Sequence, residues 1–82
     1  MKTKSLPFGS TYENKFKIGD LIYWFTWQEH EDYDIETIIH RGVLVDILHQ
    51  KNGEREVSMA KVLPYGSQET ILINITLIRK SN

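Results

Sequence analysis

Three histidines are the side chains of this chain that are best suited to acid–base or metal chemistry. His30, His40 and His49 could share a proton or a metal ion if the fold brought them together. They lie nine or ten residues apart, and no carboxylate stands at a motif spacing from any of them. We therefore interpret them as surface or sheet-end histidines.

A second candidate is the acidic segment from Gln28 to Glu36, which carries five acids within nine residues. Its oxygen atoms would suit a hard cation, but it lacks the spacing and the glycine of a calcium-binding loop. We interpret it as a solvated loop in which Asp32 and Asp34 select basic groups on a partner. The sequence has no glycine-rich phosphate loop and no serine in a nucleophile elbow, so it predicts no enzyme, no metal site and no cofactor.

A dense aromatic run is the strongest candidate for a binding surface. Side chains alternate along a strand, so Leu21, Tyr23, Phe25 and Trp27 would share one face and Ile22, Trp24 and Thr26 the other. Whichever set enters the core, the other leaves a large ring outside it. That ring is covered by the N-terminal segment or the acidic loop, or it forms a binding or self-association surface. The predicted contact residues are Tyr23, Trp24, Trp27 and Tyr65.

Basic side chains suggest an alternative contact with nucleic acid. Arg41, Arg55 and Lys61, next to an aromatic ring, would supply the phosphate contacts and stacking that single strands need. The net charge of -1 and the acidic segment argue against a domain that is basic throughout. A solvated mixture of both charges is the simpler interpretation.

Length and composition indicate one small globular domain. The chain has 82 residues, of which 40% are hydrophobic and 26% charged, and it has no cysteine. Disulfides and thiolate metal sites are therefore excluded. No apolar run has the roughly 20 residues of a membrane span, and none follows the first lysines as a secretory signal would. These features predict a cytoplasmic protein with no membrane contact.

The elements that would position these residues are short strands separated by turns. An irregular lead-in over residues 1–15 precedes expected strands at 20–27, 38–49, 55–63 and 69–73, and residues 75–79 form a helical turn or a fifth strand. Turns are predicted at residues 51–54 and 64–66. Gly42 indicates a bend or bulge, and Val43, Val45 and Ile47 share one face. Five such strands bury a core best by curling, so the sequence predicts an all-β fold, a single strongly bent five-stranded barrel over residues 16–82.

This pattern resembles the SH3-like small-barrel group, which includes KOW-like and Tudor-like modules. The resemblance covers residues 16–79, and it is also seen with small uncharacterised proteins of marine bacteriophages. The matching residues are Phe16, Ile18, Gly19, Asp20 and Ile22, the segments 42–45 and 60–63, and Leu77 and Ile78. The resemblance implies a module that binds peptides, methylated side chains or nucleic acid, or that serves in assembly, in the host cytoplasm if a phage encodes it.

Together these observations predict a non-enzymatic binding or assembly module that contacts protein or peptide, including a copy of itself, through an aromatic surface. The alternatives are a nucleic-acid-binding small barrel and a purely structural homo-oligomer.

Overall fold

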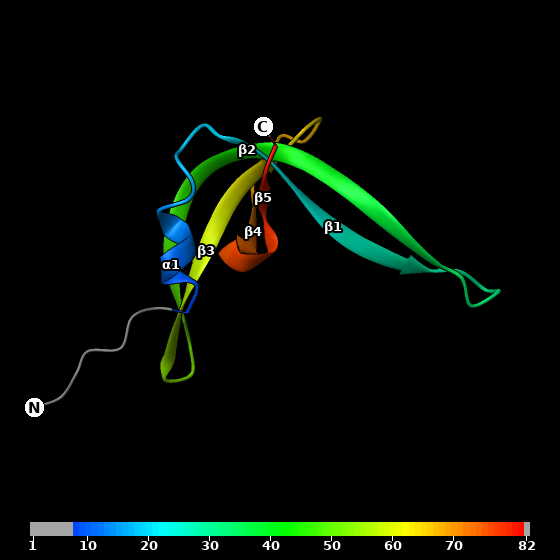
Figure 1. Ribbon diagram of the computed structural model, residues 1–82, viewed down its shortest axis with the longest axis horizontal. Helices are drawn as coiled ribbons and strands as arrows, with labels where there is room; N and C mark the ends of the chain where they lie inside the picture. Colours follow the sequence, from blue (N-terminus) through cyan, green and yellow to red (C-terminus); the bar gives the residue numbers. More distant parts are fainter. Residues whose placement is uncertain (1–7, 82) are drawn as a thin grey trace, which may run out of the picture.

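The computed structural model describes residues 8–81, which form one antiparallel sheet with a small helical cap (Figure 1). The elements are α1 (Ser10–Glu13), β1 (Leu21–Glu29), β2 (Ile35–Asn52), β3 (Arg55–Pro64), β4 (Ile71–Asn74), the 3-10 helix η1 (Ile75–Leu77) and β5 (Arg79–Lys80). The predicted lead-in falls partly on residues 1–7, which lie outside the described residues.

The sheet has five strands in the order β4-β3-β2-β1-β5, and every neighbouring pair is antiparallel. This confirms the mostly-β class and the number of strands. The segment after β4 forms both predicted alternatives, first the helical turn η1 and then the short strand β5.

The prediction of a strongly bent barrel was wrong, because the sheet neither closes nor curls strongly. β4 and β5 lie at its opposite edges. In the described residues, β5 pairs with Ile22 and Tyr23 of β1, and this two-residue ladder is too short to curl the sheet until its two edges meet. The 18-residue strand β2 instead pairs with β1 through its first half and with β3 through its second (Figure 1).

The irregularity in β2 lies after Leu44, not at Gly42. The register with β3 shifts between Leu44 and Asp46, and the Asp46 carboxylate accepts a hydrogen bond from the Ile47 amide at 2.8 Å. Val45 is the extra residue, because Leu44 and Asp46 pair with the consecutive residues Val62 and Lys61 of β3. One extra residue reverses which side chains of β2 point to each face of the sheet. Leu44 and Ile47 therefore contribute to the core, whereas the uninterrupted pattern Val43, Val45 and Ile47 was expected on one face.

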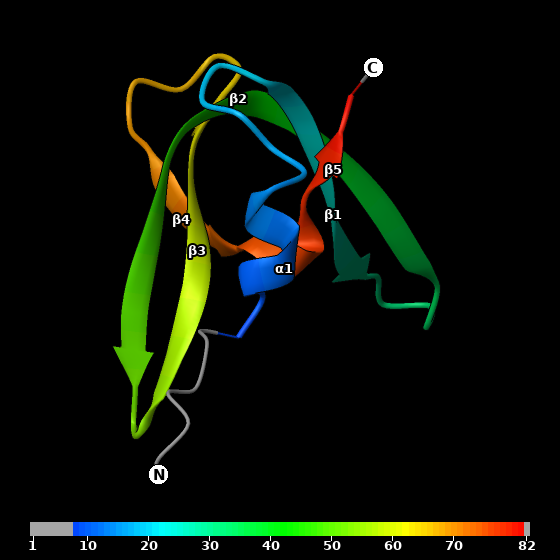
Figure 2. The same ribbon diagram turned by 60° about the vertical axis from the view of Figure 1, so that its left-hand side comes forward.

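The core lies between one face of the sheet and the segments α1 and η1 (Figure 2). Part of the predicted lead-in is therefore helical, and Tyr12 of α1 packs against the core cluster. Phe8 forms a bridge to Val57 and extends the edge of β3. The buried apolar residues are Phe16, Ile22, Trp24, Leu44, Ala60, Val62, Ile75 and Ile78.

Both predicted turns are present. Asn52 pairs with Arg55, which leaves a two-residue connection whose Gly53 has a φ of 69°. Such a positive φ is what a tight hairpin requires and glycine permits. After β3, the Ser67 amide donates to the Pro64 carbonyl, and Gly66 has a φ of 81°.

Candidate functional site

The far half of the β1–β2 hairpin projects beyond the rest of the sheet (Figure 1). We call this segment, residues 25–39, the arm. β5 pairs with β1 no further than Tyr23, and β3 pairs with β2 only from Gly42 onward. Between these limits, residues 8–81 add no further strand to the two strands of the arm. The arm contributes to the long axis of a molecule that measures 55 × 30 × 23 Å.

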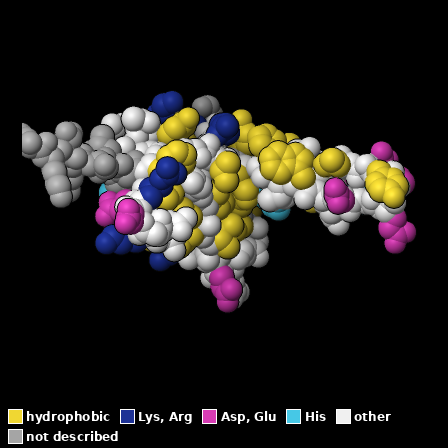
Figure 3. All heavy atoms as spheres, turned by 90° about the horizontal axis from the view of Figure 1, so that it is seen from below, with side chains coloured by type: hydrophobic (Ala, Val, Ile, Leu, Met, Phe, Trp, Pro, Cys, Tyr) yellow, Lys and Arg dark blue, Asp and Glu magenta, His cyan; other side chains and the backbone are white. Residues whose placement is uncertain are grey.

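One face of the arm is apolar and exposed. Phe25 pairs with Ile39, Trp27 with Thr37 and Glu29 with Ile35, and residues that pair directly share a face. The exposed fractions are 41% for Phe25, 69% for Trp27, 53% for Ile39 and 64% for Ile35. We call these four residues the apolar arm face. Figure 3 shows hydrophobic side chains continuing along the projecting hairpin to an acidic end.

The acidic segment forms the tip of the arm and covers no part of the aromatic strand. The loop His30–Asp34 is held by hydrogen bonds from the His30 amide to the Asp34 carbonyl and from the Tyr33 amide to the His30 carbonyl. His30 Nε2 also lies 2.7 Å from Glu36 Oε2. Tyr33, at 95% exposure, stands between Asp32 and Asp34, which are exposed as well. The tip therefore presents an aromatic ring flanked by carboxylates.

The predicted contact residues do not all lie on this surface. Trp27 lies on the apolar arm face, and Tyr23, at the base of the arm, is half-buried and packs edge-on against Phe25 with ring centroids 5.6 Å apart. Tyr65 is exposed after β3, and its amide donates to the Arg41 carbonyl. Trp24 lies on the opposite face of β1.

Trp24 belongs to the core, with only 6% of its surface exposed. Its ring stacks on His40 with centroids 5.5 Å apart and an interplanar angle of 14°. His40 is held in turn by Thr26, whose hydroxyl lies 2.7 Å from Nε2. In this structure Trp24 therefore supports the base of the arm and offers no contact surface.

The sequence interpretation missed part of the apolar arm face. It groups Phe25 with Trp27 on one face of the strand, but it places Ile35 in the loop and assigns Ile39 no partner. The alternation of Ile35, Thr37 and Ile39 was the signal that the strand begins earlier. Ile35 and Ile39 double the number of large apolar side chains that Phe25 and Trp27 provide.

The basic residues predicted to contact nucleic acid are spread along the sheet. Arg41 pairs with Tyr23 at the base of the arm, whereas Lys61 pairs with Asp46 near the middle of the sheet. Arg55 lies at the far turn, six residues along β3 from Lys61, or roughly 20 Å. Its guanidinium lies 5.4 Å from the centre of the Phe8 ring. The three side chains do not form one patch.

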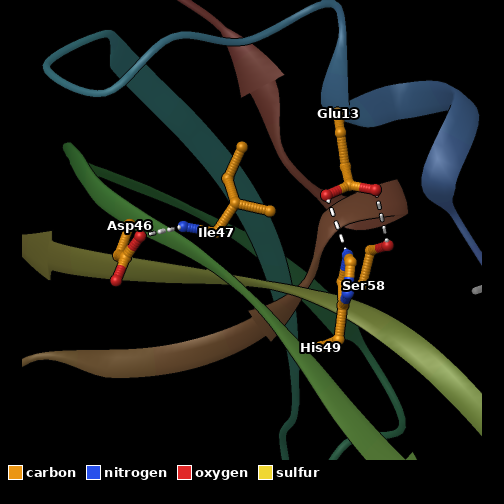
Figure 4. Close-up of polar contacts among 5 residues, drawn as sticks. All are labelled: Glu13, Asp46, Ile47, His49 and Ser58. Carbon is orange, nitrogen blue, oxygen red and sulfur yellow. Dashed lines mark hydrogen bonds and ion pairs between the residues drawn. The ribbon is translucent and has the colours of Figure 1, made fainter.

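A serine, a histidine and a glutamate do meet elsewhere, where Glu13 at the end of α1 points toward His49 of β2 and Ser58 of β3 (Figure 4). The Ser58 hydroxyl donates to Glu13 Oε2 at 3.2 Å, and His49 Nε2 lies 3.0 Å from Glu13 Oε1. The carboxylate stands between the other two groups, so His49 is not placed to take the Ser58 proton. Ser58 is also fully buried. We interpret the cluster as a fastening of α1 to the sheet.

Replacing Glu13 with alanine should lower the free energy of unfolding by about 1–3 kcal/mol, because the buried Ser58 hydroxyl loses its acceptor. Urea denaturation followed by circular dichroism measures the change. The control is Glu36→Ala, which removes the exposed pair with His30 and should cost no more than about 1 kcal/mol. Equal losses in the two variants would show that the Glu13 cluster does not fasten α1.

Within residues 8–81, no three histidine or acidic side chains converge as ligands of a metal ion. None of the helices in this range has the length and apolar character of a membrane span. Comparisons of the chain with protein-family models, with curated proteins and with solved structures gave no match.

Proposed function

We propose that this chain is a non-enzymatic protein-binding or assembly module whose contact surface is the apolar arm face. The observation that carries the proposal is the exposure of Phe25, Trp27, Ile35 and Ile39 on a segment that no other described element covers. A monomer gains nothing from large apolar side chains on a projecting hairpin, and contiguous exposed apolar surface is typical of protein contacts. A two-stranded ribbon is also only marginally stable in water, so a partner would stabilise the arm.

Protein is a better partner for this surface than nucleic acid. The tip brings five acids within residues 28–36, which would repel phosphates approaching the end of the arm. Arg41, Arg55 and Lys61 are too far apart to compensate. Asp32 and Asp34 would instead select a partner with basic side chains beside its apolar surface, as charges at the rim of an interface do.

The wider context of this function is likewise proposed. Five antiparallel strands in one sheet are consistent with an SH3-like ancestry, although the sheet is open. A cytoplasmic location, in the host cell if a bacteriophage encodes the chain, agrees with the absence of cysteine.

Site-specific photocrosslinking tests the proposal. A photoreactive phenylalanine analogue at Trp27 should give defined protein adducts in cells, whereas the same group at the exposed residue Gln68, outside the arm, should give none above background. Replacing Ile35 and Ile39 with serine should weaken the adducts formed from position 27. Equal labelling from both positions would contradict the proposal, and adducts with nucleic acid in place of protein would favour a nucleic-acid-binding role.

A further inference from the structure

One edge of the arm offers unpaired backbone groups. The Leu21 carbonyl accepts a hydrogen bond from the Ser81 amide, so it points away from β2. Because these groups alternate in direction along a strand, those of Phe25, Trp27 and Glu29 point the same way. In the described part of the chain, nothing pairs with β1 on this side beyond Tyr23 (Figure 1). The arm therefore combines an apolar face with a free strand edge, which is a template for strand addition.

A shallow hollow with basic walls lies where this free edge begins. It is lined by Tyr12, Lys15, Phe16, Ile78, Arg79 and Lys80. The Lys15 ammonium lies over the Tyr12 ring, 4.8 Å from its centre, and Arg79 and Lys80 form the strand β5 that ends the pairing with β1. The chain thus carries a basic, partly aromatic hollow at one end of the free edge and an acidic, aromatic tip at the other.

We infer that the partner of the arm is a second copy of this chain, joined by antiparallel pairing of the two β1 edges. This inference rests on the proposed function of the arm and names its partner. The β1 edge joins the two copies, and Phe25 and Trp27 of each apolar arm face lie beside β1 of the other copy on one continuous face. With Trp27 opposite Trp27 of the second copy, Phe25 of each chain faces Glu29 of the other. The position facing Tyr23 would then be residue 31, and there β5 already occupies the edge. The acidic tip of each copy therefore meets β5 and the basic hollow of the other.

Charge and strand number both favour this arrangement over the alternatives. Parallel pairing would bring the two acidic tips together, whereas antiparallel pairing separates them and gives each a basic neighbour. The two-fold axis makes both contacts identical, so the assembly closes as a dimer. Each arm also changes from an isolated two-stranded ribbon to half of a four-stranded sheet, which is large enough to be stable.

Sedimentation of the purified full chain over a wide range of dilution tests the inference. The chain should be dimeric at high concentration and dissociate on dilution. Phe25→Pro removes an edge amide and should abolish the dimer, whereas Phe25→Ala keeps the amide and should only weaken it. Thermal melts of both variants, diluted to the monomer, should agree closely, because the Phe25 amide does not pair with β2.

A charge exchange tests the contact between tip and hollow. Asp32→Lys and Arg79→Glu alone should each raise the dimer dissociation constant about threefold to tenfold, and the double variant should recover most of the loss. A dimer insensitive to Phe25→Pro and to the exchange would overturn the inference. A chain that is monomeric at every concentration would also overturn it, yet crosslinks from Trp27 to another protein would leave the proposed function standing.

Discussion

Replacing Trp24 with alanine should lower the free energy of unfolding by about 3–5 kcal/mol, which is a large part of the roughly 4–12 kcal/mol expected for a domain of this size. The indole is almost fully buried in the core cluster and is stacked on His40. Its removal leaves a cavity between the sheet and its helical cap. It also withdraws the ring on which His40 rests at the base of the arm.

The matched control is Trp27→Ala, three residues further along the same strand. This side chain is exposed, so in the dilute monomer its loss should change the free energy of unfolding by no more than about 0.5 kcal/mol. Urea denaturation of both variants gives the comparison. If Trp24→Ala does not fold, iodide quenching of tryptophan fluorescence in milder variants provides a second measurement. Trp24→Phe keeps Trp27 as the only tryptophan, and iodide should quench it readily, whereas in Trp27→Phe the remaining Trp24 should resist quenching. The reverse order of quenching would contradict the assignment of faces.

The assignment of faces along β1 depends on contacts that no local pattern contains. Both parities of the strand carry aromatic rings, so alternation alone leaves two equivalent solutions. Ile22 joins the core cluster with Ile75 and Ile78, from a segment more than 50 residues away, and this packing sets which side of β1 is covered. The same long-range dependence explains the Glu13 cluster, whose Ser58 is separated from Glu13 by 45 residues.

Local turn chemistry was sufficient to predict the number of strands and their succession along the chain, but not their order in the sheet. The turns at Gly53 and Gly66 require a positive φ, which glycine adopts easily. The apolar segments between the turns form strands. Turn chemistry could not predict whether the sheet closes into a barrel, because closure depends on the length of β5. In the part of the chain that the structure describes, this ladder consists of Arg79 and Lys80, and the sequence around them gives no measure of how far it extends.

The candidate site was predicted in composition but not in shape. Trp27 and the acids at positions 32 and 34 lie on the arm as exposed side chains, whereas Trp24 does not. The sequence interpretation ends the first strand at residue 27, two residues before the end of β1, and extends the acidic loop over residues 28–36, whereas β1 and β2 leave only residues 30–34 between them. Consequently Ile35 was assigned to the loop, and the hairpin was not recognised as a projecting segment. Its projection follows from the pairing limits at Tyr23 and Gly42, which only the assembled sheet defines.

Gly42→Ala is the second substitution with a large expected effect on the free energy of unfolding. Whether it raises or lowers this free energy tests how closely β2 approaches β3. The backbone of Gly42 lies outside the left-handed region, so alanine with sufficient space would stabilise the chain by about 0.4–1 kcal/mol through the unfolded state. Here an added Cβ would lie 2.6 Å from the Leu63 carbonyl oxygen and 2.9 Å from Val62 Cγ1. The oxygen belongs to the backbone of β3 and cannot rotate away, so we expect a loss of about 2–3 kcal/mol in urea denaturation.

The control for Gly42 is Gln50→Ala, an exposed position in the same strand, where the change should stay within about 0.5 kcal/mol. If Gly42→Ala instead stabilises the chain, the close approach of β2 to β3 is absent in solution. The position matters beyond stability, because Gly42 pairs with Ile22 on one side and with Pro64 on the other. The arm begins where this three-stranded contact ends. A residue that separates β2 from β3 at this point should therefore also loosen the arm, and hydrogen exchange in Gly42→Ala should accelerate at residues 35–41 before it does so at residues 47–52.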